Sequence, residues 1–291
     1  MQHRTETMHT LPAFSKRMET HLLKEGTRGI EQAAAALEPG YLFRAARALL
    51  DAQGPTLITT GFPVGGTFET DGPVGAIALY RVLDYLNRCP LFVGAPPLSR
   101  LLGKRFQIFE LPIASARDTA PLLETLLAQH RPDCIVSIER AGVAENGRYH
   151  NMKGDDITDF AAKVDALFGR DDLASIAIGD GGNEIGMGNA AEALSGLPIV
   201  PSITCCHELV VSSVSNWGVY GLIAMMEAMT GEELLDLCDP EAITHWLVEN
   251  GSVDGVTVKP EPTEDGFPLE LSQRLISLFR TWILEIDAVS A

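Results

Sequence analysis

The chain has 291 residues, 46% of them hydrophobic, and it carries 22 basic against 39 acidic side chains, a formal net charge of −17. This length allows one α/β domain with additions, and the apolar fraction is enough for a large buried core. The negative charge argues against a nucleic acid or an anionic membrane surface as a partner, although Arg, Lys and a metal could still hold a small anion locally.

Three helical patterns open the chain and predict a helical lead-in that ends at residue 53. They cover Phe14–Glu25, Gly29–Leu37 and Tyr41–Ala52. After Pro55, strand-like and helix-like patterns alternate. The predicted strands are Thr56–Thr60, Leu91–Gly94, Phe106–Leu111, Cys134–Ile138, Leu173–Gly179 and Ile199–Cys205. The predicted helices between them are Val74–Asn87, Leu98–Lys104, Thr119–Gln129, Ile157–Phe168 and Gly188–Leu194.

The C-terminal part is predicted to be mainly helical. Its helical patterns cover Asn216–Met229, Glu232–Leu237, Glu241–Glu249 and Leu269–Ile286, and residues 251–268, rich in Gly, Pro and acids, are predicted to form a long ordered loop. The alternation before this tail predicts an α/β fold: a mostly parallel sheet with helices on both faces. We therefore predict a single α/β domain over residues 1–291. It comprises the lead-in (1–53), a sheet core with the site motifs (54–207) and the helical tail (208–291).

The sequence also predicts where the protein works. No apolar stretch approaches the roughly 18 residues that cross a bilayer, and the first 25 residues show no export or transit signal. The five cysteines are odd in number and form no C-x-x-C pair, which favours a reducing, cytoplasmic setting without a membrane partner. The apolar run Val219–Met229 is interpreted as core or as a subunit contact, so a homo-oligomer stays open.

Residues Gly179–Asn189 combine two acids, Asp180 and Glu184, with five glycines directly behind the apolar run Ser175–Ile178. The acids therefore lie where a strand becomes a helix, which is where open α/β sheets bind ligands. A tight turn followed by a capped helix is the structural alternative, but two acids around Gly-Gly-Asn exceed what capping requires. We interpret this run as a ligand site.

Two other segments repeat this arrangement. Residues Gly65–Pro73 follow the first predicted strand and contain Glu69 and Asp71, and residues 139–156 follow the fourth and begin with Glu139. If the three strands are parallel neighbours, their carboxyl ends bring these acids and the glycine-rich run to one crevice. Such a cluster of acids needs compensation, because close carboxylates repel each other and raise a pKa.

A divalent cation would supply this compensation. The predicted metal ligands are Glu69, Asp71, Asp180 and Glu184, with Glu139 as a further candidate. Hard carboxylate ligands suit Mg²⁺, Mn²⁺ or Ca²⁺ better than zinc. A carboxyl group that does not bind the metal could carry a proton, and we assign this role to Glu139.

Several of these residues also have structural interpretations. Asp71 precedes Gly-Pro and could cap its own helix, and Gly65, Gly66 and Thr67 could form a flexible turn instead of a phosphate cradle. Glu139 and Arg140 could form an ion pair at a strand end. Asp254 could make a turn, or it could reach the crevice as a late ligand or lid contact.

Five ordered blocks resemble the signature motifs of the D-glutamate cyclase C-terminal domain family. They are GGTFETDGP (65–73), SIER (137–140), YHNMKG (149–154), GDGGNEIGMG (179–188) and VDGVT (253–257), and the similarity extends from about Gly54 to the C-terminus. The family motif often carries Arg where this chain has Lys153. That change keeps the charge but loses the bidentate geometry with which Arg binds a carboxylate.

The resemblance implies a hydro-lyase that converts D-glutamate, a small anionic amino acid, into 5-oxo-D-proline and water. The α-amine must attack a γ-carboxylate, a poor electrophile that a cation would polarise. The catalytic candidates are Glu139, Asp180 and Glu184. The substrate-binding candidates are Gly65, Gly66, Thr67, Arg140, Arg148, Asn151, Lys153, Asn183 and Asp254, with Arg140, Arg148 and Lys153 as anchors for the α-carboxylate.

Two other classes of function stay open at this point. The same acids and metal could activate water in a hydrolase or phosphatase of small anionic metabolites. Alternatively, the protein could bind a metabolite without catalysis. Fold alone does not separate these classes, because function belongs to the site.

Overall fold

Six parallel strands form the central sheet of the computed structural model, which describes residues 2–26 and 29–290, and the side chains of 11–26 and 29–286. In spatial order the strands are β5 (Ile108–Glu110), β4 (Leu91–Gly94), β1 (Thr56–Thr60), β6 (Cys134–Ile138), β7 (Ala174–Gly179) and β8 (Glu208–Val211). Thr60 pairs with Ile138, and Ile138 pairs with Ile178. The expected α/β fold is confirmed.

Helices cover the sheet, which is why its central strands carry almost no exposed side chain. Every residue of β1 and β6 is buried, as expected for parallel strands with both faces covered. The helix α8 (Ser215–Thr230) is buried from Ser215 to Met226 and packs against four others. Those four are α4 (Pro73–Tyr85), α3 (Tyr41–Asp51), α1 (Gln2–Leu22) and α10 (Leu269–Ser290).

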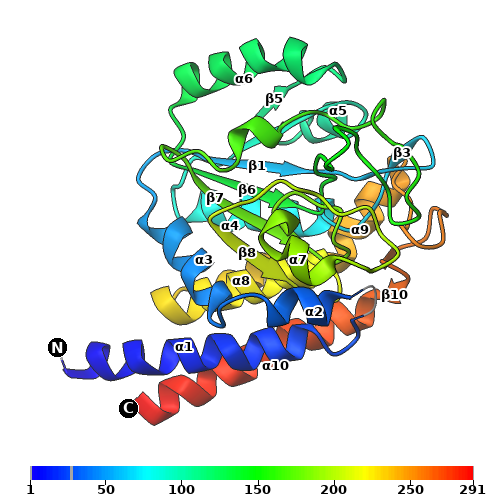
Figure 1. Cartoon of the computed structure of the whole chain (residues 1–291). Coiled ribbons are helices and arrows are strands. Elements are labelled where there is room, and N and C mark those ends of the chain that lie inside the picture. Colours follow the sequence, from blue (N-terminus) through cyan, green and yellow to red (C-terminus); the bar gives the residue numbers. More distant parts are fainter. Residues whose placement is uncertain (1, 27–28, 291) are drawn as a thin grey trace.

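The outer helices lie at opposite edges of the sheet. Figure 1 shows α6 (Ala116–His130) near β5, whereas α1 and α10 lie side by side at the β8 edge. The remaining helices are α2 (Ile30–Ala35), α5 (Leu98–Leu102), α7 (Ala191–Leu194) and α9 (Pro240–Glu249), with single 3₁₀ turns at η1 (Asp165–Leu167), η2 (Met187–Ala190) and η3 (Leu234–Leu237). No described helix is long and apolar enough to span a bilayer.

The strand order creates a crevice between β1 and β6. From β1 the chain runs outward through β4 to β5, and it then returns to β6 on the other side of β1. This is the order of a doubly wound sheet, in which ligands bind at the carboxyl ends of the strands where the direction reverses. Here those ends are Thr60 and Ile138.

Two small hairpins stand beside this crevice. The first joins β2 (Pro63–Val64) to β3 (Thr67–Phe68), and the second joins β9 (Thr263–Glu264) to β10 (Phe267–Pro268). Both two-residue turns have positive φ at each position: 59° and 82° at Gly65-Gly66, and 53° and 81° at Asp265-Gly266. Such turns match the twist of the strands they connect. The second hairpin lies within the predicted loop 251–268.

Two predicted elements were wrong. The predicted helix Ile157–Phe168 is reduced to the turn η1, because polar side chains there bond to the backbone; Lys163, for example, donates to the carbonyls of Thr158 and Ala161. The predicted strand Ile199–Cys205 is irregular. Its backbone instead bonds to neighbouring loops, as Ile203 N–H does to the Val143 carbonyl, and Pro201 lacks a donor for a ladder. The sixth strand is β8, which the sequence did not predict.

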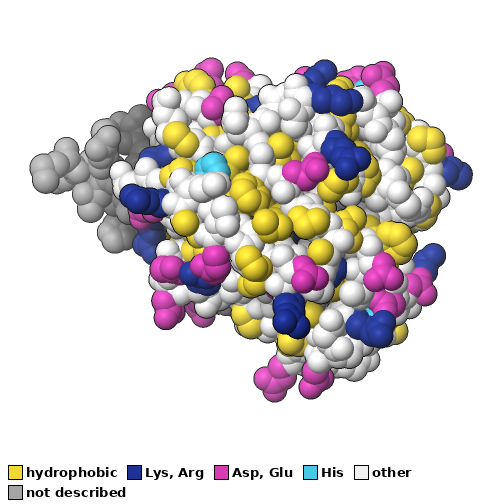
Figure 2. Space-filling view, turned by 90° about the horizontal axis from the view of Figure 1, so that it is seen from above, with side chains coloured by type: hydrophobic (Ala, Val, Ile, Leu, Met, Phe, Trp, Pro, Cys, Tyr) yellow, Lys and Arg dark blue, Asp and Glu magenta, His cyan; other side chains and the backbone are white. Residues whose placement is uncertain are grey.

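Acidic side chains occur on the molecular surface as well as at the strand ends. On the face seen in Figure 2, Asp and Glu side chains lie mainly around the margin and are interspersed with Lys and Arg. Solvated acids of this kind need no special explanation. The acids at the carboxyl ends of β1, β6 and β7 differ because they are buried.

Candidate active site

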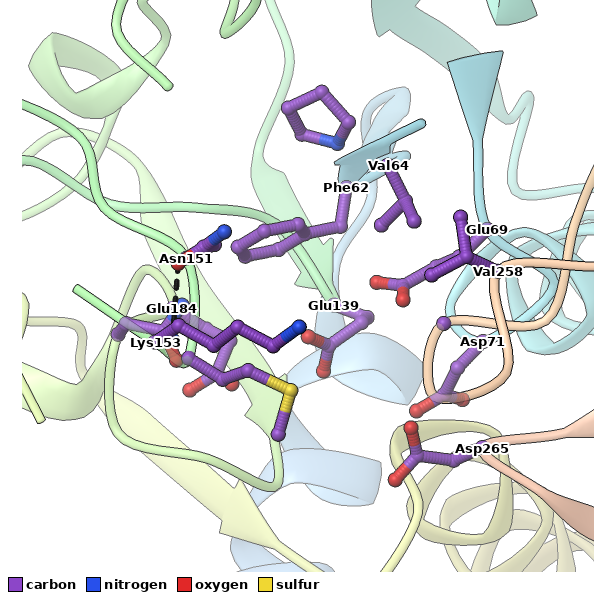
Figure 3. Close-up of a pocket in the computed structure, with 14 residues that line it drawn as sticks. Phe62, Val64, Glu69, Asp71, Glu139, Asn151, Lys153, Glu184, Val258 and Asp265 are labelled. Atoms are coloured by element: carbon purple, nitrogen blue, oxygen red, sulfur yellow. Dashed lines mark hydrogen bonds between the residues drawn. The ribbon is translucent and has the colours of Figure 1, made fainter. Parts of the chain in front are cut away.

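A pocket of about 100 Å³ opens at the carboxyl ends of β1 and β6. Since one water needs roughly 10–15 Å³ of such space, the pocket is large enough for a small molecule. Figure 3 shows its walls. The lining residues are Phe62, Pro63, Val64, Glu69, Asp71, Glu139, Asn151, Met152, Lys153, Asn183, Glu184, Gly255, Val258 and Asp265.

Three buried carboxylates approach one another beside this pocket. Asp71, Glu139 and Asp180 each place one oxygen within 4.8 Å of the other two, the only such metal-type group among the described residues. Burial, followed by the charges of Asp180 and Glu184, holds the pKa of Glu139 well above its usual range. Burial and then the charge of Asp265 do the same for the pKa of Asp71. Three oxygen donors of this kind suit a hard divalent cation.

Asp71 bonds to the starts of two helices: it caps α8, and its Oδ1 also accepts the N–H of Gly72, the N-cap residue of α4, at 3.0 Å. Its two carboxylate oxygens accept the Ser215 and Asn216 N–H groups, at 2.9 and 2.8 Å, at the start of α8. In return, the side-chain oxygen of Asn216 accepts the Gly72 and Gly75 N–H groups, at 2.9 and 2.8 Å, at the start of α4. The two helices therefore cap each other, and both N-termini point at the acidic cluster.

Glu139 lies in the left-handed region, with φ of 41°, directly after β6. Such backbone outliers are rare for non-glycine residues and concentrate at active sites. The Ser215 hydroxyl donates to its carboxylate at 2.6 Å. Gly72 packs against it so closely that an added Cβ would come within 2.7 Å of the Glu139 Cβ. The sequence did not reveal Ser215 as a site residue, because its partner lies 76 positions earlier.

Glu184 shapes the glycine-rich run. Its two carboxylate oxygens accept the Gly181 and Gly182 N–H groups at 2.9 and 2.7 Å, and it lines the pocket outside the three-carboxylate group. Asn183 donates to the His150 carbonyl at 2.9 Å and thereby joins this run to the loop that carries Lys153. Glu69, the other predicted metal ligand, also lines the pocket outside that group.

Three of the predicted substrate-binding residues line the pocket: Asn151, Lys153 and Asn183. Lys153 is the only basic residue of the lining. In Figure 3 its amino group points into the pocket toward Glu139, whereas Glu69, Asp71 and Asp265 lie on the opposite wall. The pocket lining thus has one basic residue, Lys153, among five acids, of which three lie opposite it.

The structure gives the two predicted arginine anchors other roles. The buried Arg140 guanidinium donates to the Thr60 carbonyl at 2.6 Å and to the Ala162 carbonyl at 3.2 Å, which ties the end of β1 to a neighbouring loop. Arg148 forms an exposed ion pair with Asp156. Neither arginine lines the pocket, so Lys153 alone stays as a predicted anchor.

The remaining predicted contacts are structural. Asp254 is fully buried, and its carboxylate accepts hydrogen bonds from the N–H groups of Val256, Thr257 and Gly266 and from the Thr263 hydroxyl. Its turn-forming alternative is therefore correct. Gly65 and Gly66 form the β2–β3 turn, and the Thr67 hydroxyl donates to the Gly251 carbonyl at 2.7 Å. None of these four lines the pocket.

Several lining residues were missed from the sequence. Phe62, Val64 and Val258 supply an apolar wall, and Asp265 adds an acid from the β9–β10 turn. The pair Asp265-Gly266 is a recognisable hairpin signal that could have located the turn. Nothing local to it indicates that the turn faces the pocket.

The raised carboxyl pKa values predict how stability depends on pH. In the unfolded chain these acids ionise near pH 4, whereas in the folded protein Glu139 and Asp71 ionise only at higher pH. The folded state therefore binds more protons above about pH 4, and rising pH removes stability. We expect the unfolding free energy of chelator-treated protein to fall as the pH rises above about 4.

Denaturant titrations at several pH values would measure this fall. Saturating Mn²⁺ should reduce it, because the cation replaces the bound protons as counter-charge. A metal-free protein whose stability rises steadily over this range would contradict the raised pKa values.

The pocket lies in the part of the chain that is similar to known proteins. Residues 19–280 match the family model described as D-glutamate cyclase-like, C-terminal. The human protein named D-glutamate cyclase, mitochondrial, is 31% identical over 224 residues. This match covers 68% of the present chain but only 36% of the human protein. All the pocket-lining residues fall within the family match.

Proposed function

Because the chain belongs to the D-glutamate cyclase-like family, we propose that it is a lyase that converts D-glutamate into 5-oxo-D-proline and water. The observation that carries this proposal is the group of three buried carboxylates beside a pocket whose opposite end holds Lys153. Glutamate is a small amino acid with ten non-hydrogen atoms. Its two carboxylates and one ammonium group match a pocket with charges of both signs.

The reaction requires a bond between the α-nitrogen and the γ-carboxyl carbon. One carbon–oxygen bond of that carboxylate breaks, and two of the three ammonium protons leave with the oxygen as water. The third proton stays on the lactam nitrogen. The site must therefore neutralise the γ-carboxylate and move protons from nitrogen to oxygen.

Asp71 and Asp180 would hold a divalent cation at the carboxyl ends of β1 and β7, with Mg²⁺, Mn²⁺ or Ca²⁺ as candidates. Mg²⁺ commonly uses one or two protein carboxylates together with oxygens of the substrate. The Asp71 carboxylate is already oriented by two α8 N–H groups, which favour its ionised form. When bound, the cation would polarise the γ-carboxylate.

Glu139 is the best candidate for the proton carrier. Backbone N–H groups can only donate, so Asp71 and Glu184 are held as acceptors by their partners. The partner of Glu139 is the Ser215 hydroxyl, which can donate to the ionised form or accept from the protonated form. The raised pKa of Glu139 brings its proton exchange closer to neutral pH.

Lys153 would bind the α-carboxylate, while Phe62, Val64 and Val258 would contact the methylene carbons. A lysine ammonium acts as a point charge, without the planar fork of arginine. Asn151 stabilises the lysine loop, because its side-chain oxygen accepts the Lys153 and Asp155 N–H groups at 2.9 Å each. These contacts fix the backbone from which the Lys153 side chain extends.

A cytoplasmic location is a further part of this proposal. All five cysteines are described and are free, which supports a reducing compartment. The human relative is named as a mitochondrial protein.

The direct test is to incubate the purified protein with D-glutamate and Mn²⁺ or Mg²⁺ and to follow 5-oxoproline by chiral chromatography. We expect 5-oxo-D-proline to form, and a chelator to stop its formation until the cation is restored. L-Glutamate serves as the stereochemical control. Failure to form 5-oxoproline with any cation would reject the proposal, and phosphate release from phosphomonoesters would favour a metal-dependent hydrolase.

A further inference from the structure

The β9–β10 hairpin brings an acid from the C-terminal part of the chain into the pocket. Asp265 is the first residue of its two-residue turn and is half-buried in the pocket wall. In Figure 3 its carboxylate faces Asp71. The charge of Asp265 is, after burial, the largest contribution to the raised pKa of Asp71, which agrees with their proximity.

Buried hydrogen bonds fix the backbone on both sides of Asp265. The preceding Glu264 is fully buried and accepts from the Asn216 amide at 3.0 Å, from the Tyr220 hydroxyl at 2.9 Å and from the Ser272 hydroxyl. The following Gly266 donates its N–H to Asp254 at 2.6 Å. The turn is therefore anchored to α8, to α10 and to its own loop, and the position of the Asp265 side chain does not depend on a freely moving tip.

Glu69 approaches the same place from the segment that follows β3. It is buried and forms a β-bridge to Val253, so the strand-like backbone after β3 pairs with the loop that carries Asp265. A Cβ added at Gly255 would lie 1.9 Å from a Glu69 oxygen and 3.6 Å from an Asp265 oxygen. The Glu69 and Asp265 carboxylates therefore both lie close to Gly255. Neither belongs to the group formed by Asp71, Glu139 and Asp180.

We propose that Asp265 and Glu69 form the ammonium-binding end of the pocket and select substrates that carry an α-amino group. This inference rests on the proposed function, since it assigns a place to the amino group of glutamate. The only basic lining residue, Lys153, lies on the opposite wall and would take a carboxylate. A zwitterion bound between these ends has its nitrogen near the acids and its methylene carbons along the apolar wall.

The test compares two ligands that differ in the amino group alone. D-Glutamate and glutarate share both carboxylates and the same carbon chain, but glutarate lacks the ammonium. Isothermal titration calorimetry with Mn²⁺-loaded protein would give both dissociation constants. We expect Asp265→Asn to weaken D-glutamate binding about 10- to 100-fold, as for a lost charged hydrogen bond, and to change glutarate binding less than about twofold.

Two further variants strengthen the test. Gly255→Ala should also weaken D-glutamate selectively, because the new methyl group displaces the end of the flexible Glu69 side chain, and Gly255 lies outside the positive-φ glycines. Glu261→Gln is the matched control, since Glu261 lies on the same loop but contacts Lys259 and Thr257. It should bind both ligands as the unchanged protein does.

Other outcomes would overturn the inference. Equal weakening of D-glutamate and glutarate by Asp265→Asn, together with weaker Mn²⁺ binding, would make Asp265 a cation ligand. Unchanged D-glutamate binding in Asp265→Asn and Gly255→Ala would show that Asp265 and Glu69 do not bind the ammonium group. Selective binding of D-glutamate without 5-oxoproline formation would reject the proposed reaction but keep the ammonium site. Failure of the unchanged protein to bind D-glutamate would overturn both.

Discussion

Glu139→Gln is expected to lower kcat for 5-oxoproline formation by about 10²- to 10⁴-fold, the usual contribution of a positioned proton carrier. Glutamine has the shape of glutamate and can still accept the Ser215 hydroxyl, so the local packing is kept. It cannot take the proton from the substrate ammonium. Steady-state kinetics should show the loss mainly in kcat, because Lys153 and the apolar wall still bind the substrate.

The same variant should be more stable than the unchanged protein when metal is absent. Removing one charge from three close, buried carboxylates relieves repulsion at neutral pH. Glu124→Gln is the matched control, because Glu124 forms only an exposed ion pair with Arg170 and should change neither property. Nearly full activity in Glu139→Gln would show that another group carries the proton.

Asn216→Ala is expected to have the largest effect on stability, about 2–4 kcal/mol of unfolding free energy. The fully buried Asn216 side chain accepts the N–H groups of Gly72 and Gly75 and donates to Glu264 at 3.0 Å. Alanine would leave the Gly75 N–H at the start of α4 without its acceptor and would remove a donor from the buried Glu264 carboxylate. The N-cap position of α4 is Gly72, which has no side chain to compensate.

Denaturant unfolding followed by circular dichroism would measure this loss. Asn250→Ala is the control, since the exposed Asn250 side chain donates to the Trp246 carbonyl and the substitution keeps the backbone N–H. It should change stability by less than about 0.5 kcal/mol. Activity should also fall in Asn216→Ala, because α4 and α8 hold Asp71 and Ser215 in the site. A loss no larger than that of the control would contradict the reciprocal capping as a source of stability.

The periodicity of the sequence was sufficient for most of the fold. β-Branched runs such as Thr56–Thr60 and Cys134–Ile138 alternate with helical patterns, and both runs are strands at the predicted positions. The prediction from alternation was wrong where the backbone bonds to distant segments of the chain. Residues 199–205 look like a strand, yet their backbone bonds to loops around the glycine-rich run.

The candidate site was partly predictable for the same reason. Acids directly after parallel strands must lie at one edge of the sheet, so Glu139 and Asp180 could be expected to come together. The same reasoning could not exclude Arg140 from the site. Its neighbour Glu139 faces the carboxylate group, whereas the Arg140 guanidinium donates to backbone carbonyls. Adjacent residues at a strand end can point to opposite sides.

The sequence by itself determined the α/β alternation, the acids at the strand ends and the family motifs, because each depends on neighbours within a few positions. Only the tertiary structure decided what those residues contact. Asp71 precedes α4 but caps α8, whose first residue lies 144 positions later. In turn, the Asn216 side chain accepts N–H groups at the start of α4. Asp265 likewise reaches the pocket only because its hairpin packs against α8 and α10. Hydrogen bonding and burial act through space, so contacts between distant segments leave no local pattern in the chain.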